Sequence, residues 1–205
     1  FIFTYNKDLS KDFSLNVQFG GIKRTNYYKR NYFYVGELVV DGLYNAGNSV
    51  PSANSIESNI TRSETQSLFG TANFSWKNAV FLDLTARNDW SSTLPKEARS
   101  YFYLSASLST VFTELLDLKS DILTFGKVRA SYALVGNDAT PYQLAQTFTS
   151  SGSWNGTTAK FAENVQIANS GLKPEITTGL ELGTDLRFFR GKLGLDVTYY
   201  NQTTR

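Results

Sequence analysis

Apolar and polar residues alternate through most of this chain with a period of two, as they do in strands that bury one face. In residues 12–20, Phe13, Leu15 and Val17 fall on one face, and Ser14 and Asn16 fall on the other. No stripe with the helical period of 3.6 residues continues beyond about two turns. The alternation predicts an all-β chain with eight strands, centred on residues 1–5, 12–20, 68–76, 80–87, 102–112, 128–134, 180–188 and 193–199.

The charged residues of these segments all fall on the polar side of the alternation: Asp83, Arg87, Lys127, Arg129, Glu181, Asp185, Arg187 and Asp196. A charge that faces lipid at mid-membrane costs roughly 2–4 kcal/mol, so the wall of a transmembrane barrel requires this segregation. A soluble β-sandwich follows the same alternation. Several runs are longer than the usual soluble strand of about 5–6 residues and suit a tilted membrane-spanning strand, which favours an antiparallel transmembrane β-barrel.

The connections between the predicted strands differ in length, and mostly alternate between short and long. Short connections near residues 6–11, 77–78 and 190–192, together with 113–124, are expected at one end of the sheet. Long connections at 25–64, 90–100 and 137–175 are expected at the other end, outside the membrane, because outer-membrane barrels have short periplasmic turns and long external loops. Within 113–124, the sequence predicts one helical turn started by Thr113.

Composition narrows the functional class. Aromatic residues make up 15% of the chain, and clusters such as YYKRNYFY (27–34) and YFY (101–103) lie near strand ends, where membrane interfaces place aromatic rings. The 20 basic and 18 acidic residues are dispersed, so we expect no nucleic-acid partner. There is no His or Cys, which argues against catalysis. With no Met and a strand-like start, FIFTY, the chain is expected to be a piece of a longer protein.

Five segments are informative when taken in order: LVVDGLYNAGNS (38–49), FLDLTARNDWSSTLP (81–95), SYFYLSASLSTVF (100–112), VRASYALVGND (128–138) and LKPEITTGLELGTDLRFFRGKLGLDVTYYNQTT (172–204). Together they resemble the barrel of SusC/RagA-type TonB-dependent outer-membrane transporters. The resemblance implies a barrel of about 22 strands closed by a plug. Residues 1–205 would be a partial barrel domain, an arc of about eight strands whose first and last strands are not paired with each other. The signal sequence, plug, TonB box and C-terminal strands would lie outside it.

The same resemblance implies a bacterial outer-membrane importer that is not an enzyme and needs no cofactor. It would take up oligosaccharides or peptides, with a SusD-like surface lipoprotein as a lid and with energy delivered by TonB through the plug. Lipid of the outer membrane would surround the barrel. The alternatives are a soluble β-sandwich carbohydrate-binding module and a passive outer-membrane barrel.

Aromatic and amide residues on the expected external loops are the candidate contacts for substrate or lid: Asn88, Asp89, Trp90, Asn137, Asp138, Tyr142 and Trp154. An exposed Trp beside polar groups can stack on a sugar ring while its neighbours bind hydroxyls. The alternative interpretation is that Trp90 ends a strand in an aromatic girdle and that the polar residues order turns. Neither RNDWSS nor GNDAT has the spacing of a calcium-binding loop, so no metal is assigned.

Overall fold

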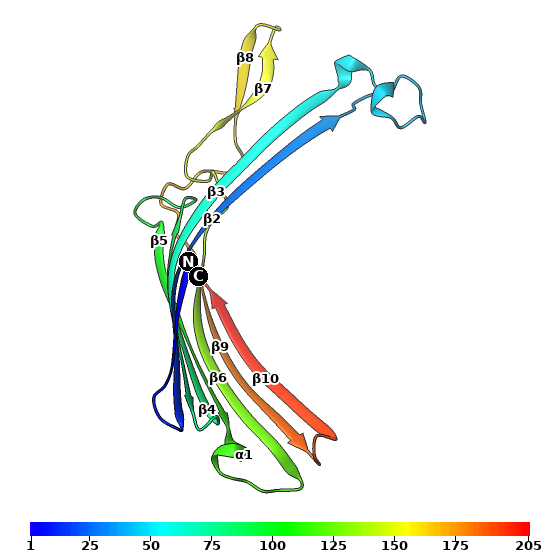
Figure 1. Ribbon diagram of the computed structural model, residues 1–205. Helices are drawn as coiled ribbons and strands as arrows, with labels where there is room; N and C mark the ends of the chain where they lie inside the picture. Colours follow the sequence, from blue (N-terminus) through cyan, green and yellow to red (C-terminus); the bar gives the residue numbers. More distant parts are fainter. The chain divides into compact units, whose positions relative to one another are not determined.

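The computed structural model describes residues 1–205, and most of the chain is β-strand (Figure 1). Eight strands form one sheet in the order β1-β2-β3-β4-β5-β6-β9-β10, and β7 and β8 form a separate two-stranded hairpin. The bounds are β1 Ile2–Asp8, β2 Phe13–Tyr34, β3 Ser55–Trp76, β4 Val80–Ser91, β5 Ser100–Val111, β6 Leu123–Asn137, β7 Phe148–Trp154, β8 Thr158–Glu163, β9 Glu175–Phe188 and β10 Leu193–Thr204. The short helices are η1 Ala46–Asn48, η2 Pro51–Ala53 and α1 Phe112–Leu115.

The strand registers place the charged strand residues on one face of the sheet. Directly opposed residues in neighbouring strands point to the same side. Lys127 of β6 lies opposite Asp185 of β9, which lies opposite Asp196 of β10. Asp83 of β4 lies opposite Ser107 of β5, which lies opposite Ser131 of β6, and Ser131 lies opposite Glu181 of β9. All eight charged residues named above therefore share what we call the polar face, as predicted.

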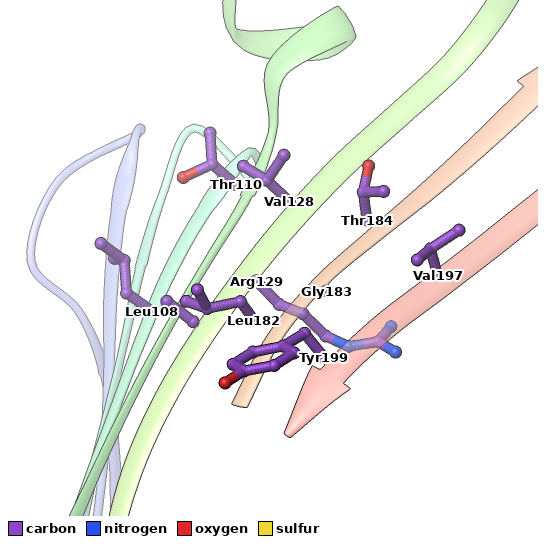
Figure 2. Close-up of a pocket in the computed structure, with 10 residues that line it drawn as sticks. Leu108, Thr110, Val128, Arg129, Leu182, Gly183, Thr184, Val197 and Tyr199 are labelled. Atoms are coloured by element: carbon purple, nitrogen blue, oxygen red, sulfur yellow. The ribbon is translucent and has the colours of Figure 1, made fainter. Parts of the chain in front are cut away.

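The opposite side of the sheet, the apolar face, carries aliphatic and aromatic side chains that remain accessible. Leu108 is 48% exposed, Leu182 45% and Val197 51%. A hollow of about 490 Å³ is lined by residues from β5, β6, β9 and β10 (Figure 2). Its lining includes Leu108, Val128, Leu182, Val197, Tyr199, Thr110, Thr184 and Ala130 from this face, together with Gly183 and Arg129. So much exposed apolar surface marks a sheet that is covered by another apolar phase, as a barrel wall is by lipid.

The single sheet argues against a β-sandwich. Its strands pair with their neighbours in the chain, apart from the step from β6 to β9 across the β7–β8 hairpin. The other sheet is that two-stranded hairpin, which is too small to form the second layer of a sandwich. The sheet is open, because β1 pairs with β2 and β10 pairs with β9, and these two strands are its outer members. The predicted absence of pairing between the first and last strands is confirmed.

The two ends of the sheet carry the connections that the sequence predicts. Lys77 and Asn78 both have positive φ, 51° and 52°, in the tight turn between β3 and β4, as a type I′ hairpin requires. Trp90 pairs with Gln66 and Ser100 near the far end of β4. Connections 92–99 and 138–174 lie at that far end, which we call the long-connection end. The predicted opposition of Trp90 and the 77–78 turn is confirmed.

Three details of the connections differ from expectation. β2 and β3 continue well into the expected loop 25–64, so the connection itself is 35–54. Connection 138–174 contains the β7–β8 hairpin, which the alternation did not reveal. Helix α1 forms where a helical turn was expected, but Val111 occupies its N-cap. Thr113 is buried instead, and its hydroxyl accepts a hydrogen bond from the Gly126 amide at 3.1 Å.

The chain forms two compact units, residues 1–24 with 65–205, and residues 25–64. The smaller unit contains η1, η2 and the adjoining parts of β2 and β3. Within it, the Asn48 side chain donates hydrogen bonds to the carbonyls of Val40 and Leu43, and Arg62 lies 5.1 Å from the centre of the Tyr27 ring. No helix in the structure has the length and apolar character that crossing a membrane requires.

Candidate ligand-binding site on the polar face

An ion pair between half-buried Arg87 and buried Asp89 lies on the polar face near the long-connection end. The alternation of β4 puts Arg87, Asp89 and Ser91 on this face, and the register sets Ser67 and Tyr101 opposite Asp89. Asp89 is only 4% exposed. Its Oδ1 accepts a hydrogen bond from Arg87 Nε at 2.7 Å. The Asp89 charge is therefore balanced within the strand that carries it.

Further donors complete the surroundings of this pair. The Tyr103 hydroxyl donates to Asp89 Oδ2 at 2.8 Å, and Arg87 Nη2 donates to the Ser67 hydroxyl at 3.0 Å. A buried carboxylate is stable only when its charge is paired and its lone pairs are bonded. Both conditions hold for Asp89. Arg87, Asp89 and Tyr103 form a hydrogen-bonded polar floor that spans β4 and β5.

A second carboxylate, Asp138, lies beside this floor where the chain leaves β6. The Ser91 hydroxyl donates to Asp138 Oδ2 at 2.5 Å, and the Thr65 hydroxyl lies 3.4 Å from the same oxygen. Ser91 also exchanges a hydrogen bond with Thr93 at 2.9 Å. These contacts fasten the beginning of connection 138–174 to β3 and β4.

The two carboxylates line a small cavity of about 180 Å³ on the polar face. Its lining residues include Arg24, Arg87, Asp89, Tyr101, Tyr103 and Asp138. The Tyr101 and Tyr103 rings stack, with 6.1 Å between their centres and 18° between their planes. Gly136 lets the rings lie there, because a Cβ at this position would come within 2.5 Å of the Tyr101 ring. The cavity therefore offers carboxylates, guanidinium groups and phenol hydroxyls in one place.

The structure brings together three of the seven residues predicted to contact substrate or lid. Asp89, Asn137 and Asp138 line the cavity. Asn88 and Trp90 lie on the apolar face of β4, alternating with Arg87 and Asp89. The Asn88 amide donates to the Ser100 hydroxyl at 3.0 Å.

Trp90 belongs to a strand, because β4 continues to Ser91. It is half-buried on the apolar face of that strand and not on a loop. Tyr142, in connection 138–174, is 66% exposed with φ of 66°. Trp154 is 64% exposed at the end of β7. Neither of these two residues lines the cavity.

Arg87, Tyr101 and Tyr103 line the cavity but are not among the seven residues that the sequence predicts to contact substrate or lid. The sequence places Arg87 only on the polar face and the YFY segment in an aromatic girdle. The signal available was the two-residue spacing of Arg87 with Asp89 and of Tyr101 with Tyr103, which puts each pair on one face of a strand. That these pairs face each other depends on the register between β4 and β5.

A second charged cluster ties β6, β9 and β10 together on the same face. Arg129 reaches across β9 to donate to Asp196 at 3.1 Å and to the Thr198 hydroxyl. Gly183, directly between them in the register, makes room, because a Cβ there would come within 2.5 Å of Arg129 Nε. No group of three or more His, Cys, Asp or Glu side chains is arranged to hold a metal ion.

The fold and the charge segregation define a segment of an outer-membrane β-barrel wall. The chain belongs to the family described as TonB dependent receptor-like, beta-barrel, whose model matches residues 2–205. This is a family of outer-membrane transporters and not of enzymes. The membership confirms the predicted fold class and the predicted location in the outer membrane.

Two curated relatives come from Formosa agariphila. TonB-dependent receptor P26 is 28% identical over 167 residues, and TonB-dependent receptor P3 is 31% identical over 148 residues. The matches cover 80% and 71% of this chain, but the chain spans only 17% and 15% of the relatives' lengths.

Solved structures of the RagAB peptide transporter share the fold. One superimposes with a TM-score of 0.81 at 18% identity, over 98% of this chain and 22% of the other. The "closed-closed" state of the RagAB peptide importer gives a TM-score of 0.80 at 18% identity with the same coverage. The chain thus corresponds in fold to about a fifth of a RagAB transporter chain.

Proposed function

We propose that this chain forms part of the barrel wall of a TonB-dependent importer of oligosaccharides or peptides. The observation that carries the proposal is the division of the sheet into a charged face and an exposed apolar face. In a wide barrel, the apolar face meets lipid and the polar face lines an aqueous lumen. Membership of the TonB-dependent receptor family supports active import through that lumen.

The long-connection end is proposed to face the outside of the cell. Long loops are typical of the external side of outer-membrane barrels, and short turns of the periplasmic side. The cavity beside Asp138 then opens toward incoming substrate, and connection 138–174 is placed to meet a SusD-like lipoprotein lid. The β7–β8 hairpin, with the exposed Trp154, extends the surface available for that contact.

Energy dependence provides the test of this function. Uptake of labelled oligosaccharides and peptides is measured in cells that carry the intact protein, with and without TonB and with and without a proton uncoupler. We expect uptake that requires both TonB and the proton-motive force. Uptake that persists without TonB would show a passive barrel instead. Co-purification of a SusD-like lipoprotein from the outer membrane tests the proposed lid.

A further inference from the structure

The cavity on the polar face contains two charged groups that the protein does not pair. Of its four charged lining residues, Arg87 and Asp89 neutralise each other at 2.7 Å. Asp138 receives hydrogen bonds only from the hydroxyls of Ser91 and Thr65. Arg24, on β2, forms no ion pair in the structure. One carboxylate and one guanidinium therefore remain for a ligand.

The hydrogen bonds to Asp138 leave a specific atom open. Both hydroxyls approach Oδ2, so Oδ1 has no donor from the protein. An ionised carboxylate accepts about four hydrogen bonds over its two oxygens. Asp138 is half-buried as a residue, and its open oxygen can accept a charge-assisted hydrogen bond from a ligand.

Tyr101 supplies an independent observation that points to a ligand. Its side chain lines the cavity, the residue is only 8% exposed, and its hydroxyl forms no hydrogen bond within the protein. A tyrosine with a buried ring usually has a partner for its hydroxyl. Tyr103, two residues away, follows this rule by donating to Asp89. The Tyr101 hydroxyl oxygen itself stays accessible from the cavity, because the buried polar side-chain atom without a partner is Asn54 Oδ1. The Tyr101 hydroxyl is free to accept from, or donate to, a bound molecule.

We propose that this cavity binds the ammonium end of a peptide, an inference that rests on the import function proposed above. Asp138 Oδ1 pairs with the ammonium, the Tyr101 hydroxyl oxygen accepts a hydrogen bond from a second of its three N–H groups, and Arg24 binds a carbonyl or carboxylate oxygen further along the peptide. At about 180 Å³ the cavity is below the roughly 300–1,000 Å³ of a complete ligand site, so it holds one end of a longer molecule. A neutral sugar would leave the charge of Asp138 unpaired.

The experiment compares pairs of peptides that differ only in the charge of the amino terminus. Short peptides with a free or an N-acetylated amino terminus are titrated into the intact transporter in detergent, and the ratio of their two dissociation constants is the readout. The Asp138→Asn variant removes the carboxylate charge and keeps a side chain that can bond Ser91 and Thr65. Asp83→Asn is the matched control, since Asp83 is a carboxylate on the same face that accepts from Asn73 at 2.6 Å and forms no ion pair.

We expect the wild-type protein to prefer the free amino terminus by about tenfold, as for one charge-assisted hydrogen bond in a sheltered site. Asp138→Asn should abolish the preference, Tyr101→Phe should reduce it about threefold, and Asp83→Asn should leave it intact. Because the ratio is taken within each variant, a change in the amount of folded protein does not affect it. Tyr101→Phe provides the same test if Asp138→Asn fails to assemble.

Two outcomes would overturn the proposal. Peptides with a free and with an acetylated amino terminus could have equal dissociation constants, which would exclude the ammonium site but not the import function. Alternatively, Asp138→Asn could weaken the binding of oligosaccharides, which would assign the cavity to sugars. Absence of TonB-dependent uptake of either class would contradict the proposed function itself.

Discussion

The Ser91 hydroxyl donates a hydrogen bond of 2.5 Å to Asp138, which joins the last residue of β4 to the first residue after β6. Ser91 is 1% exposed, and its hydroxyl also contacts Thr93. A connection from residue 138 to residue 174 begins at this contact. The contact therefore fixes where that connection leaves the sheet.

Loss of the Ser91 hydroxyl should loosen the base of that connection. In Ser91→Ala, the half-buried Asp138 carboxylate loses its shortest donor and keeps the Thr65 hydroxyl at 3.4 Å, at a cost of about 1 kcal/mol for one hydrogen bond. Hydrogen exchange of the amides just after Asp138 should accelerate in the intact protein. Ser105→Ala, on the same face of β5, is the control, and it should leave their exchange unchanged. Equal protection in both variants would contradict a fastening role.

Removal of the Arg87 charge should destabilise the barrel through Asp89. Arg87→Met leaves a buried carboxylate without its cation, and we expect roughly 1.5–3 kcal/mol less free energy of unfolding for the intact protein. Asp89→Asn in the same chain should restore part of this loss, because the unpaired charge is gone. A double-mutant cycle measured by denaturant unfolding gives the coupling. Additive single effects would show that the two residues act independently.

A methyl group at Gly136 should disturb the cavity. The added Cβ of Gly136→Ala would come within 2.5 Å of the Tyr101 ring and 3.2 Å of the Tyr103 ring. Overpacking of this kind costs about 1–3 kcal/mol and displaces the rings. Gly194→Ala is a matched control, because no atom lies within 4 Å of its added Cβ. The denaturation midpoint should fall in the first variant only, and equal midpoints would show that the rings can move aside freely.

A charge introduced on the apolar face of β5 should lower the stability of the barrel far more than a charge introduced on the polar face. Leu108→Lys puts an ammonium on the apolar face and should cost roughly 2–4 kcal/mol if this position lies near the bilayer midplane. Ser107→Lys, the adjacent residue on the polar face, should cost far less, because its side chain enters the lumen. Unfolding of the intact protein in lipid bilayers measures both. Equal costs would contradict the assignment of the apolar face to lipid.

The alternation predicted most of the fold because a sheet between two different phases imposes a period of two on every strand. The alternation did not predict strands whose two faces are both exposed to water. Residues 55–64, SIESNITRSE, carry polar groups on both sides, so the alternation predicts a loop there, yet these residues extend β3. The same reason explains the missed β7–β8 hairpin, whose residues are all exposed.

The candidate site was only partly predictable for a different reason. Asp89 and Asp138 attracted attention through their local motifs, but their proximity depends on the β4–β5 and β5–β6 registers. Tyr101 gave no sign in the sequence that its hydroxyl lacks a partner. Trp90 was a candidate through its polar neighbours. In a strand, however, the residues beside it point to the opposite face, so Asp89 enters the cavity and Trp90 does not.

This placement changes what is expected of the aromatic candidates. Tyr142 and Trp154 are exposed in connection 138–174, and each substitution to Ala should weaken ligand capture or lid association by on the order of 1 kcal/mol if the ring stacks on its partner. Trp90→Ala should instead lower the stability of the barrel in lipid and leave ligand affinity unchanged, because the ring lies on the apolar face. Binding titrations and bilayer unfolding on all three variants separate the two roles. Weakened ligand binding in Trp90→Ala with normal stability would show that Trp90 contacts the ligand. Unchanged ligand binding and lid association in the other two variants would show that Tyr142 and Trp154 contact neither.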